Sequence, residues 1–240
     1  MAIWLALILG AYLLGSVPVS YIVAKLSRGI DLRQYGTGQV GAGNLWRLTS
    51  WRLALPIAIF DLIKGLVMVW VAQLMGLDIT QQLAVGLAAI IGHNWPVFLR
   101  FSGGRGIGTT IGVIIILPII NDMTLWGTVA FLTILIIGTL IMRSSPVPVF
   151  VGVAALPLVS WFYEPLSVTL GFLAMFLIIV IKRLTAPRSG EAALVSKGQL
   201  LLNRLLFDRD IMDRKAWMYR VPPEAGSTEP PFVQREQKKG

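Results

Sequence analysis

Seven apolar runs, each close to the length of a membrane span, constrain this chain more than any other feature. A helix needs roughly 20 apolar residues to cross about 30 Å of hydrocarbon. The runs lie near 2–24, 53–76, 80–100, 104–121, 124–142, 146–162 and 165–181. Only 14% of the 240 residues are charged, against about 25% in soluble domains. The sequence therefore predicts an all-α integral membrane protein with seven transmembrane helices.

The basic residues alternate between the connections of these runs. Twenty of the 21 Lys and Arg lie after the first, third, fifth and seventh runs, and the other connections carry only Asp78, Asp122 and Glu164. Because basic loops stay in the cytoplasm, we expect the N-terminus outside and the C-terminus inside. The first run lacks a basic leader and a cleavage site, so we expect it to be retained. This asymmetry accounts for the net charge of +9 without a nucleic-acid partner.

The composition divides the chain into three parts. Residues 1–185 form the predicted seven-helix membrane domain. Residues 186–220 alternate leucine clusters with charges, which favours either an amphipathic interfacial helix or a solvated helix packed on the cytoplasmic loops. Residues 221–240 are rich in proline and charge, and such composition predicts a disordered tail.

Two glycine-rich segments interrupt the apolar pattern on the predicted cytoplasmic side. They are "QYGTGQVGAGNLWR", from Gln34 to Arg47, and "FSGGRGIGTTIG", from Phe101 to Gly112. Glycine lets successive N–H groups converge on an anion, and a helix beginning there adds its positive end. Two segments of this kind predict a phosphate site. The alternative is that the glycines serve turns or close helix packing, as Gly108 and Gly112 would in a small-residue pattern.

The members of the predicted phosphate site share small size, a hydroxyl or amide, or a positive charge. They are Thr37, Gly38, Asn44, Arg47, Gly103, Gly104, Arg105, Gly106 and Thr109. His93 comes just before the second segment, as either a packing residue or a base. Asp61 and Lys64 lie three residues apart within one run and favour either a structural ion pair or a role in the site. With no cysteine and one histidine, no metal or cofactor is expected.

Two longer stretches resemble the signatures of a known family. "GSVPVSYIVAKLSRGIDLRQYGTGQVGAGNLWR" (15–47) and "GHNWPVFLRFSGGRGIGTTIG" (92–112) resemble, in order, two signatures of the bacterial acyl-phosphate-dependent (PlsY-type) glycerol-3-phosphate acyltransferases. "FDLIKG" (60–65) resembles the stretch between them. The resemblance implies seven spans in a bacterial plasma membrane, with the active site on the cytoplasmic face. It also implies transfer of an acyl group from acyl phosphate to the 1-hydroxyl of glycerol 3-phosphate, giving lysophosphatidic acid and phosphate in phospholipid biosynthesis.

The resemblance also gives roles to residues. Arg47 takes the place of the arginine that holds substrate phosphate, Arg105 that of the phosphate-binding lysine, and Thr37 that of a serine. With His93, the two arginines form the predicted catalytic set. The proton of the substrate hydroxyl is expected to pass either to His93 or to a substrate phosphate oxygen.

The chain departs from the family after its last span. There it reads "IKRLTAPRSGE", without the histidine and asparagine of the third signature. Two other functions stay open: a membrane transporter of a small anion, and a non-catalytic lipid-binding relative. The expected partners are acyl phosphate, glycerol 3-phosphate and membrane lipids, with no obligate protein partner.

Overall fold

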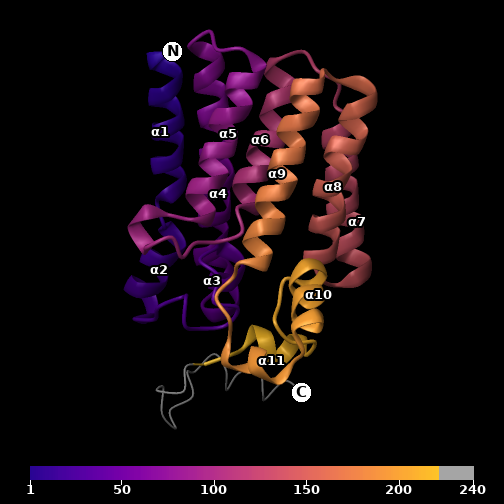
Figure 1. The fold of residues 1–240 in the computed structure, drawn as a ribbon. Coiled ribbons are helices and arrows are strands. Elements are labelled where there is room, and N and C mark those ends of the chain that lie inside the picture. The colour runs from indigo at the N-terminus through magenta and orange to yellow at the C-terminus, as the bar shows by residue number, and fades with distance from the viewer. Residues whose placement is uncertain (222–240) are drawn as a thin grey trace.

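The computed structural model describes residues 1–221 as an all-helical bundle (Figure 1). Seven apolar helices run side by side: α1 (Ala2–Ser16), α4 (Trp51–Leu74), α5 (Ile79–Asn94), α6 (Ile107–Ile120), α7 (Trp126–Met142), α8 (Pro146–Tyr163) and α9 (Leu166–Leu184). At the lower end of Figure 1 lie α2 (Val19–Arg28), α3 (Ala42–Leu48), α10 (Lys197–Phe207) and α11 (Arg214–Met218). Two short 3₁₀ helices, η1 (Val97–Leu99) and η2 (Gly190–Leu194), lie in connections.

The prediction of an all-α membrane protein is confirmed. Within the described residues, five helical stretches are long and apolar enough to cross a membrane: Ala2–Arg28, Trp51–Leu74, Ile79–Leu99, Pro146–Tyr163 and Leu166–Leu184. The apolar helices α6 and α7 are shorter, with 14 and 17 residues. The seven-span count and the orientation of the ends therefore stay predictions.

The first predicted span, 2–24, is two helices instead of one. Pro18 lies at the break, where it precedes the first residue of α2, and Val17 before it has extended backbone angles. A residue before proline is pushed away from the helical region, so α1 ends at Ser16. By contrast, Pro56, Pro118 and Pro157 lie inside α4, α6 and α8 without ending them.

Glycines bring neighbouring helices into backbone contact. A Cβ atom at Gly92 on α5 would overlap the carbonyl oxygen of Tyr12 on α1, and one at Gly112 on α6 would overlap that of Leu62 on α4. Gly108 also faces α4, next to Asp61. Small residues allow this approach inside membranes, where van der Waals contact drives helix association. For Gly108 and Gly112, the packing alternative is therefore what the structure shows.

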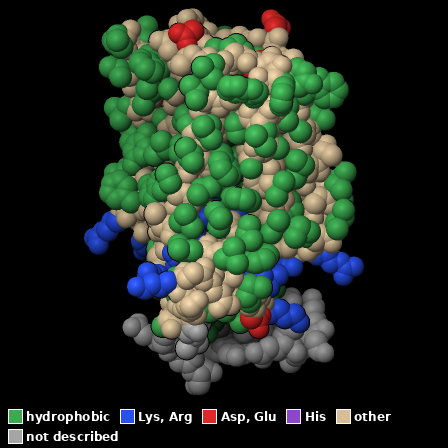
Figure 2. All heavy atoms as spheres, turned by 45° about the vertical axis from the view of Figure 1, so that its right-hand side comes forward, with side chains coloured by type: hydrophobic (Ala, Val, Ile, Leu, Met, Phe, Trp, Pro, Cys, Tyr) green, Lys and Arg blue, Asp and Glu red, His purple; other side chains and the backbone are tan. Residues whose placement is uncertain are grey.

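The helices from α4 to α9 share one apolar core. Leu117 of α6, Phe131 of α7 and Met175 of α9 are all completely buried in it. The outer surface is also apolar across the middle of the molecule, while basic side chains gather toward the lower end and acidic ones are seen at both ends (Figure 2). A band of apolar surface between two charged ends is the pattern of a protein set in a bilayer.

Residues 186–220, for which both alternatives predicted a helix, contain several short helices. They form η2, α10 and α11, with residues 208–213 as an irregular segment between the last two helices. Helix α10 contacts the lower ends of α8 and α9 (Figure 1). Apart from Val221, the predicted tail 221–240 lies outside the described residues.

Candidate active site

A cavity of about 520 Å³ lies at the lower end of the bundle, where the basic side chains gather. Four segments of the chain line it: residues 37–47, the stretch 104–108 that opens α6, the α7–α8 connection at 143–146, and residues 207–218. Asp61, His93 and Arg183 also border it. The two glycine-rich segments of the sequence therefore meet at one cavity.

Asn44 organises the first of these walls. Its side-chain oxygen accepts a hydrogen bond from the Thr37 amide (3.1 Å), while its side-chain nitrogen donates to the carbonyls of Leu32 (3.3 Å), Tyr35 (3.0 Å) and Gln39 (3.1 Å). Only 2% of the surface of Asn44 is exposed, and its side chain stabilises the conformation of the loop through these four bonds. It leaves the buried Thr37 hydroxyl oxygen without a hydrogen-bond partner beside the cavity.

The second wall is the N-terminus of α6. Gly106 precedes the helix with a φ of +69°, a backbone conformation that suits glycine. It has no side chain with which to cap the first amides of α6, and Ile107 and Gly108 border the cavity. Uncapped N–H groups and the positive end of the helix dipole favour an anion at this place.

The glycines before α6 fit tightly against the end of α5. A Cβ atom at Gly104 would overlap the Nε2 atom of His93, and one at Gly103 would overlap the His93 carbonyl. The Gly104 amide already donates to that carbonyl (3.1 Å), so it is not available to a ligand. These two glycines place the His93 ring beside the cavity.

His93 belongs to a buried charged group. Its Nδ1 atom lies 3.4 Å from Oδ1 of Asp61, and the same oxygen lies 3.0 Å from Nζ of Lys64. Lys64 also donates to the carbonyls of Gly15 (3.0 Å) and Val17 (3.4 Å) at the break after α1. Asp61 therefore forms the predicted ion pair with Lys64, and it also contacts His93 at the cavity, so that its role in the site stays a prediction.

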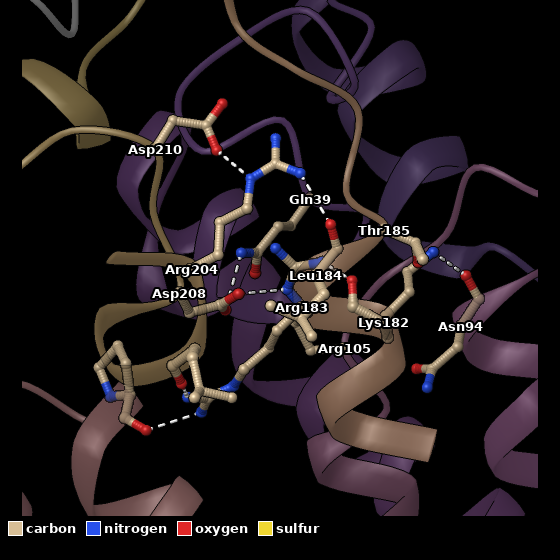
Figure 3. A network of polar contacts seen from close by, with 12 residues as sticks. Gln39, Asn94, Arg105, Lys182, Arg183, Leu184, Thr185, Arg204, Asp208 and Asp210 are labelled. Carbon is tan, nitrogen blue, oxygen red and sulfur yellow. Dashed lines mark hydrogen bonds and ion pairs between the residues drawn. The ribbon is translucent and has the colours of Figure 1, made fainter. Parts of the chain in front are cut away.

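Arg105 borders the cavity, and two of its side-chain nitrogens contact other residues (Figure 3). Nε lies 2.7 Å from Oδ1 of Asp208, at ion-pair distance, and Nη1 donates to the carbonyl of Lys182 (2.9 Å). Asp208 also accepts from the side chain of Gln39 through its other oxygen (3.0 Å). Only 11% of the side-chain surface of each ion-pair partner is exposed.

Arg47 lies on α3, across the first wall. Its Nη1 atom donates to the Gly43 carbonyl (3.0 Å), and within residues 1–221 it forms no ion pair with a carboxylate. Desolvation, and then the positive charge of Arg214, lower the pKa of Arg47, although an arginine stays charged at neutral pH.

The predicted site residues divide into two groups. Those that border the cavity are Thr37, Asn44, Arg47, His93, Gly104, Arg105 and Gly106. Gly38, Gly103 and Thr109 do not border it. Gly38 supports the loop with a φ of +71°, and Thr109 is fully buried against Gly65 of α4.

The sequence pattern did not identify the cavity residues in the last described part of the chain, three of which are charged. Asp208, Arg209 and Arg214 border the cavity from the α10–α11 region, which was expected to be an interfacial or packed helix. The only signal for them is the charge cluster in "FDRDIMDR". Nothing in that cluster indicates which charges turn toward the glycine-rich segments.

Comparison with known proteins gives the site its context. Residues 5–188 match the family model described as glycerol-3-phosphate acyltransferase. The chain belongs to this family. The predicted resemblance and the predicted enzyme class, an acyltransferase of phospholipid synthesis, are thereby confirmed.

Individual members of the family match most of the chain. Glycerol-3-phosphate acyltransferase 4 of Dehalococcoides mccartyi (strain CBDB1) is 40% identical and covers 91% of this chain and 94% of its own length. A glycerol-3-phosphate acyltransferase of Thermus thermophilus is 37% identical, covering 79% of this chain and 92% of its own. The crystal structure of PlsY (YgiH) in its glycerol 3-phosphate form has a TM-score of 0.64 and 28% identity, covering 80% of this chain and 98% of that one.

Proposed function

We propose that this acyltransferase takes its acyl group from an acyl phosphate and transfers it to the 1-hydroxyl of glycerol 3-phosphate, giving lysophosphatidic acid and inorganic phosphate. The observation that carries the proposal is the meeting of Arg47, Arg105 and the uncapped start of α6 at one cavity. Both substrates carry a phosphate, and these three groups favour anions. Apolar side chains of the bundle, Ala58, Leu135 and Val149, line the cavity together with the charged residues, so an acyl tail can lie among the helices while its phosphate lies at the charged end.

The reaction joins the hydroxyl oxygen to the carbonyl carbon and breaks the bond from that carbon to the phosphate oxygen. Arg47 and Thr37 hold glycerol 3-phosphate, and the start of α6 with Arg105 holds the leaving phosphate. Fixing two reactants side by side supplies much of the rate. Cationic and N–H donors stabilise the charge that the phosphate gains as it leaves, so no protein nucleophile takes part.

His93 receives the proton of the attacking hydroxyl in this proposal. A carboxylate can only accept, so the Nδ1 atom that faces Asp61 carries the proton and Nε2 has the free lone pair. Nε2 faces Gly104 at the cavity wall. A phosphate oxygen of the substrate is the other acceptor, and a variant of His93 separates the two.

The proposed setting is a bacterial plasma membrane with seven spans, the N-terminus outside and the cavity at the cytoplasmic face. The arginines that border the cavity and the basic side chains at the lower end of Figure 2 support this orientation. An anion transporter would be expected to bind near the membrane midplane, whereas this cavity lies at one end of the bundle.

The test is an assay of the purified full-length protein with acyl phosphate and glycerol 3-phosphate. We expect phosphate release and lysophosphatidic acid in equal amounts. Arg47→Ala and Arg105→Ala should each lose about 100-fold or more in kcat/KM, while Arg28→Ala, on the exposed side of α2, should behave as wild type. Solute uptake or lipid binding without acyl transfer would refute the proposal.

A further inference from the structure

The segment after residue 188 forms a wall of the cavity although the family model ends there. Six of its residues border the cavity: Phe207, Asp208, Arg209, Arg214, Trp217 and Met218. The Dehalococcoides relative covers 91% of this chain, so its match must extend beyond residue 188. The PlsY crystal structure leaves a fifth of this chain without a counterpart.

Specific buried contacts fix the beginning of this wall. Arg204 has 4% of its surface exposed and forms an ion pair with the equally buried Asp210 (2.7 Å). It also donates to the carbonyls of Leu184 (2.9 Å) and Pro187 (3.3 Å) at the end of α9. Arg183 of α9 donates to the Leu205 carbonyl (2.6 Å). The contacts within this network are drawn in Figure 3.

The end of the wall is fixed to the first glycine-rich loop. The Gly36 amide donates to the Arg220 carbonyl (2.9 Å), and Nε of Arg220 donates back to the Gly36 carbonyl (3.0 Å). The Arg220 guanidinium lies 3.6 Å from the ring centre of Trp217, which is buried. Residues 203–220 are therefore attached at both ends to elements that carry the predicted site.

Asp208 lies in the middle of this wall and holds Arg105. A guanidinium has five N–H donors in a rigid fork. The Asp208 carboxylate faces Nε, and the Lys182 carbonyl receives a bond from Nη1. These two contacts involve Nε and Nη1, so Nη2 is the nitrogen that remains for a ligand.

Arg209 and Arg214 add positive charge opposite Arg47. Within residues 1–221, neither forms an ion pair with a carboxylate. Desolvation lowers the pKa of Arg209, and the nearby Arg214 lowers it further, as it does for Arg47. All three arginines border one cavity, where an anion bound between them would relieve their mutual repulsion.

The charges of the whole cavity match its proposed ligands. Among residues 1–221, the side chains that border it include six arginines, Arg47, Arg105, Arg143, Arg183, Arg209 and Arg214, and two carboxylates, Asp61 and Asp208. Because Lys64 already neutralises Asp61, the surplus is five positive charges. Two phosphate groups bring about −3 to −4 together, which offsets most of this surplus.

We infer that residues 203–220 are part of the active site, where Arg214 binds the phosphate of glycerol 3-phosphate together with Arg47 and Asp208 positions Arg105. This inference rests on the proposed function. Arg214 is a binding residue, and Asp208 is a positioning residue that acts through Arg105.

The test compares single variants of the full-length protein in the acyl-transfer assay. Arg214→Ala should raise KM for glycerol 3-phosphate about 10-fold or more, with KM for acyl phosphate unchanged. Lys215→Ala removes the same charge from the next residue, which is exposed and does not border the cavity, and should match wild type. Asp208→Ala should lower kcat about 10-fold with little change in KM for glycerol 3-phosphate, and Asp208→Asn should recover part of the loss.

Titration of glycerol 3-phosphate without the acyl donor tests Arg214 separately. Its affinity should fall about 10-fold in Arg214→Ala and not in Lys215→Ala, for variants whose unfolding temperature matches wild type. If wild type is active and the kinetics of Arg214→Ala and Asp208→Ala equal those of wild type, this inference is overturned while the proposed function stands. Faster turnover in Asp208→Ala would also overturn it, since Asp208 would then obstruct Arg105. An inactive wild type would instead refute the proposed function.

Discussion

The Nδ1 atom of His93 lies 3.4 Å from a carboxylate oxygen of Asp61, which lies 3.0 Å from Nζ of Lys64. Asp61 thereby connects a buried cation to the histidine of the cavity. Because the carboxylate lies at Nδ1 and fixes the orientation of the ring, Nε2 is left on the side of Gly104 at the cavity wall, and this arrangement suits a proton acceptor better than a packing residue.

Replacement of His93 tests that role. His93→Gln keeps a polar side chain and should lower kcat about 100-fold or more, the usual contribution of a general base. Steady-state kinetics should show KM for both substrates nearly unchanged. A loss smaller than about threefold in a stably folded variant means that the proton passes to a substrate phosphate oxygen.

Arg105→Lys should not be a conservative change in this chain. One ammonium group cannot reproduce both the Asp208 contact and the bond to the Lys182 carbonyl. We expect kcat to fall about 10-fold, and Arg100→Lys, an exposed position nearby, to show no loss. Combining Arg105→Lys with Asp208→Ala should cost less than the sum of the two single losses. Strict additivity would mean that the two residues act independently.

Asn44→Ala should loosen the first glycine-rich loop. The variant leaves the Thr37 amide and three carbonyls without their side-chain partner. We expect the free energy of unfolding to fall by about 1–3 kcal/mol and activity to fall with it. Thermal unfolding in detergent measures the first effect. Gln34→Ala, exposed in the same loop, serves as control, and equal unfolding temperatures for both variants would contradict the assigned role.

The Asp210 carboxylate makes attachment of the last segment dependent on pH. Burial raises its pKa, but hydrogen bonds from Arg204 and the Ser189 amide, with the charge of Arg204, outweigh burial and hold the pKa below its usual value. A lowered pKa adds stability that is complete above the unfolded value of about 3.9 and is lost as pH falls through the folded value.

Asp210→Asn should therefore unfold at a lower temperature than wild type at pH 7, and the difference should shrink below about pH 4. Thermal unfolding across this range measures it, with the exposed Asp122→Asn as control. If the difference in unfolding temperature between wild type and Asp210→Asn grew as the pH fell, the ionised carboxylate would not be the stabilising form.

Apolar periodicity and charge asymmetry were sufficient to predict the helices of the bundle. Each of the seven predicted spans has a helix at its place, because burial in lipid leaves the backbone few alternatives. The break at Pro18 was harder to predict, since proline also occurs inside α4, α6 and α8 without ending them. What differs at Pro18 is that Lys64, 47 residues after Val17 in the chain, donates to the carbonyls freed at the break.

The sequence predicted the part of the candidate site that the glycine-rich segments form. It did not predict the wall that residues 203–220 form. Glycine and arginine patterns identify Arg47 and Arg105 because they are local in sequence. The ion pair between Arg105 and Asp208 joins residues about a hundred positions apart, and local pattern carries no information about that pairing. Asn44 is similar. Its residue type indicates a polar contact, but only the fold shows that its side-chain amide hydrogen-bonds to the backbone of the loop.

The bonds from Lys64 to the end of α1 also bear on how the chain is made. Synthesis proceeds from the N-terminus, so the residues that carry these carbonyls, Gly15 and Val17, are made before Lys64. Lys64 and Asp61 lie on the same helix, α4, and neutralise each other. The carbonyls at the end of α1 accept the remaining hydrogen bonds of the Lys64 ammonium group. The break between α1 and α2 thus supplies backbone acceptors for the Lys64 ammonium group, which α4 buries inside the bundle.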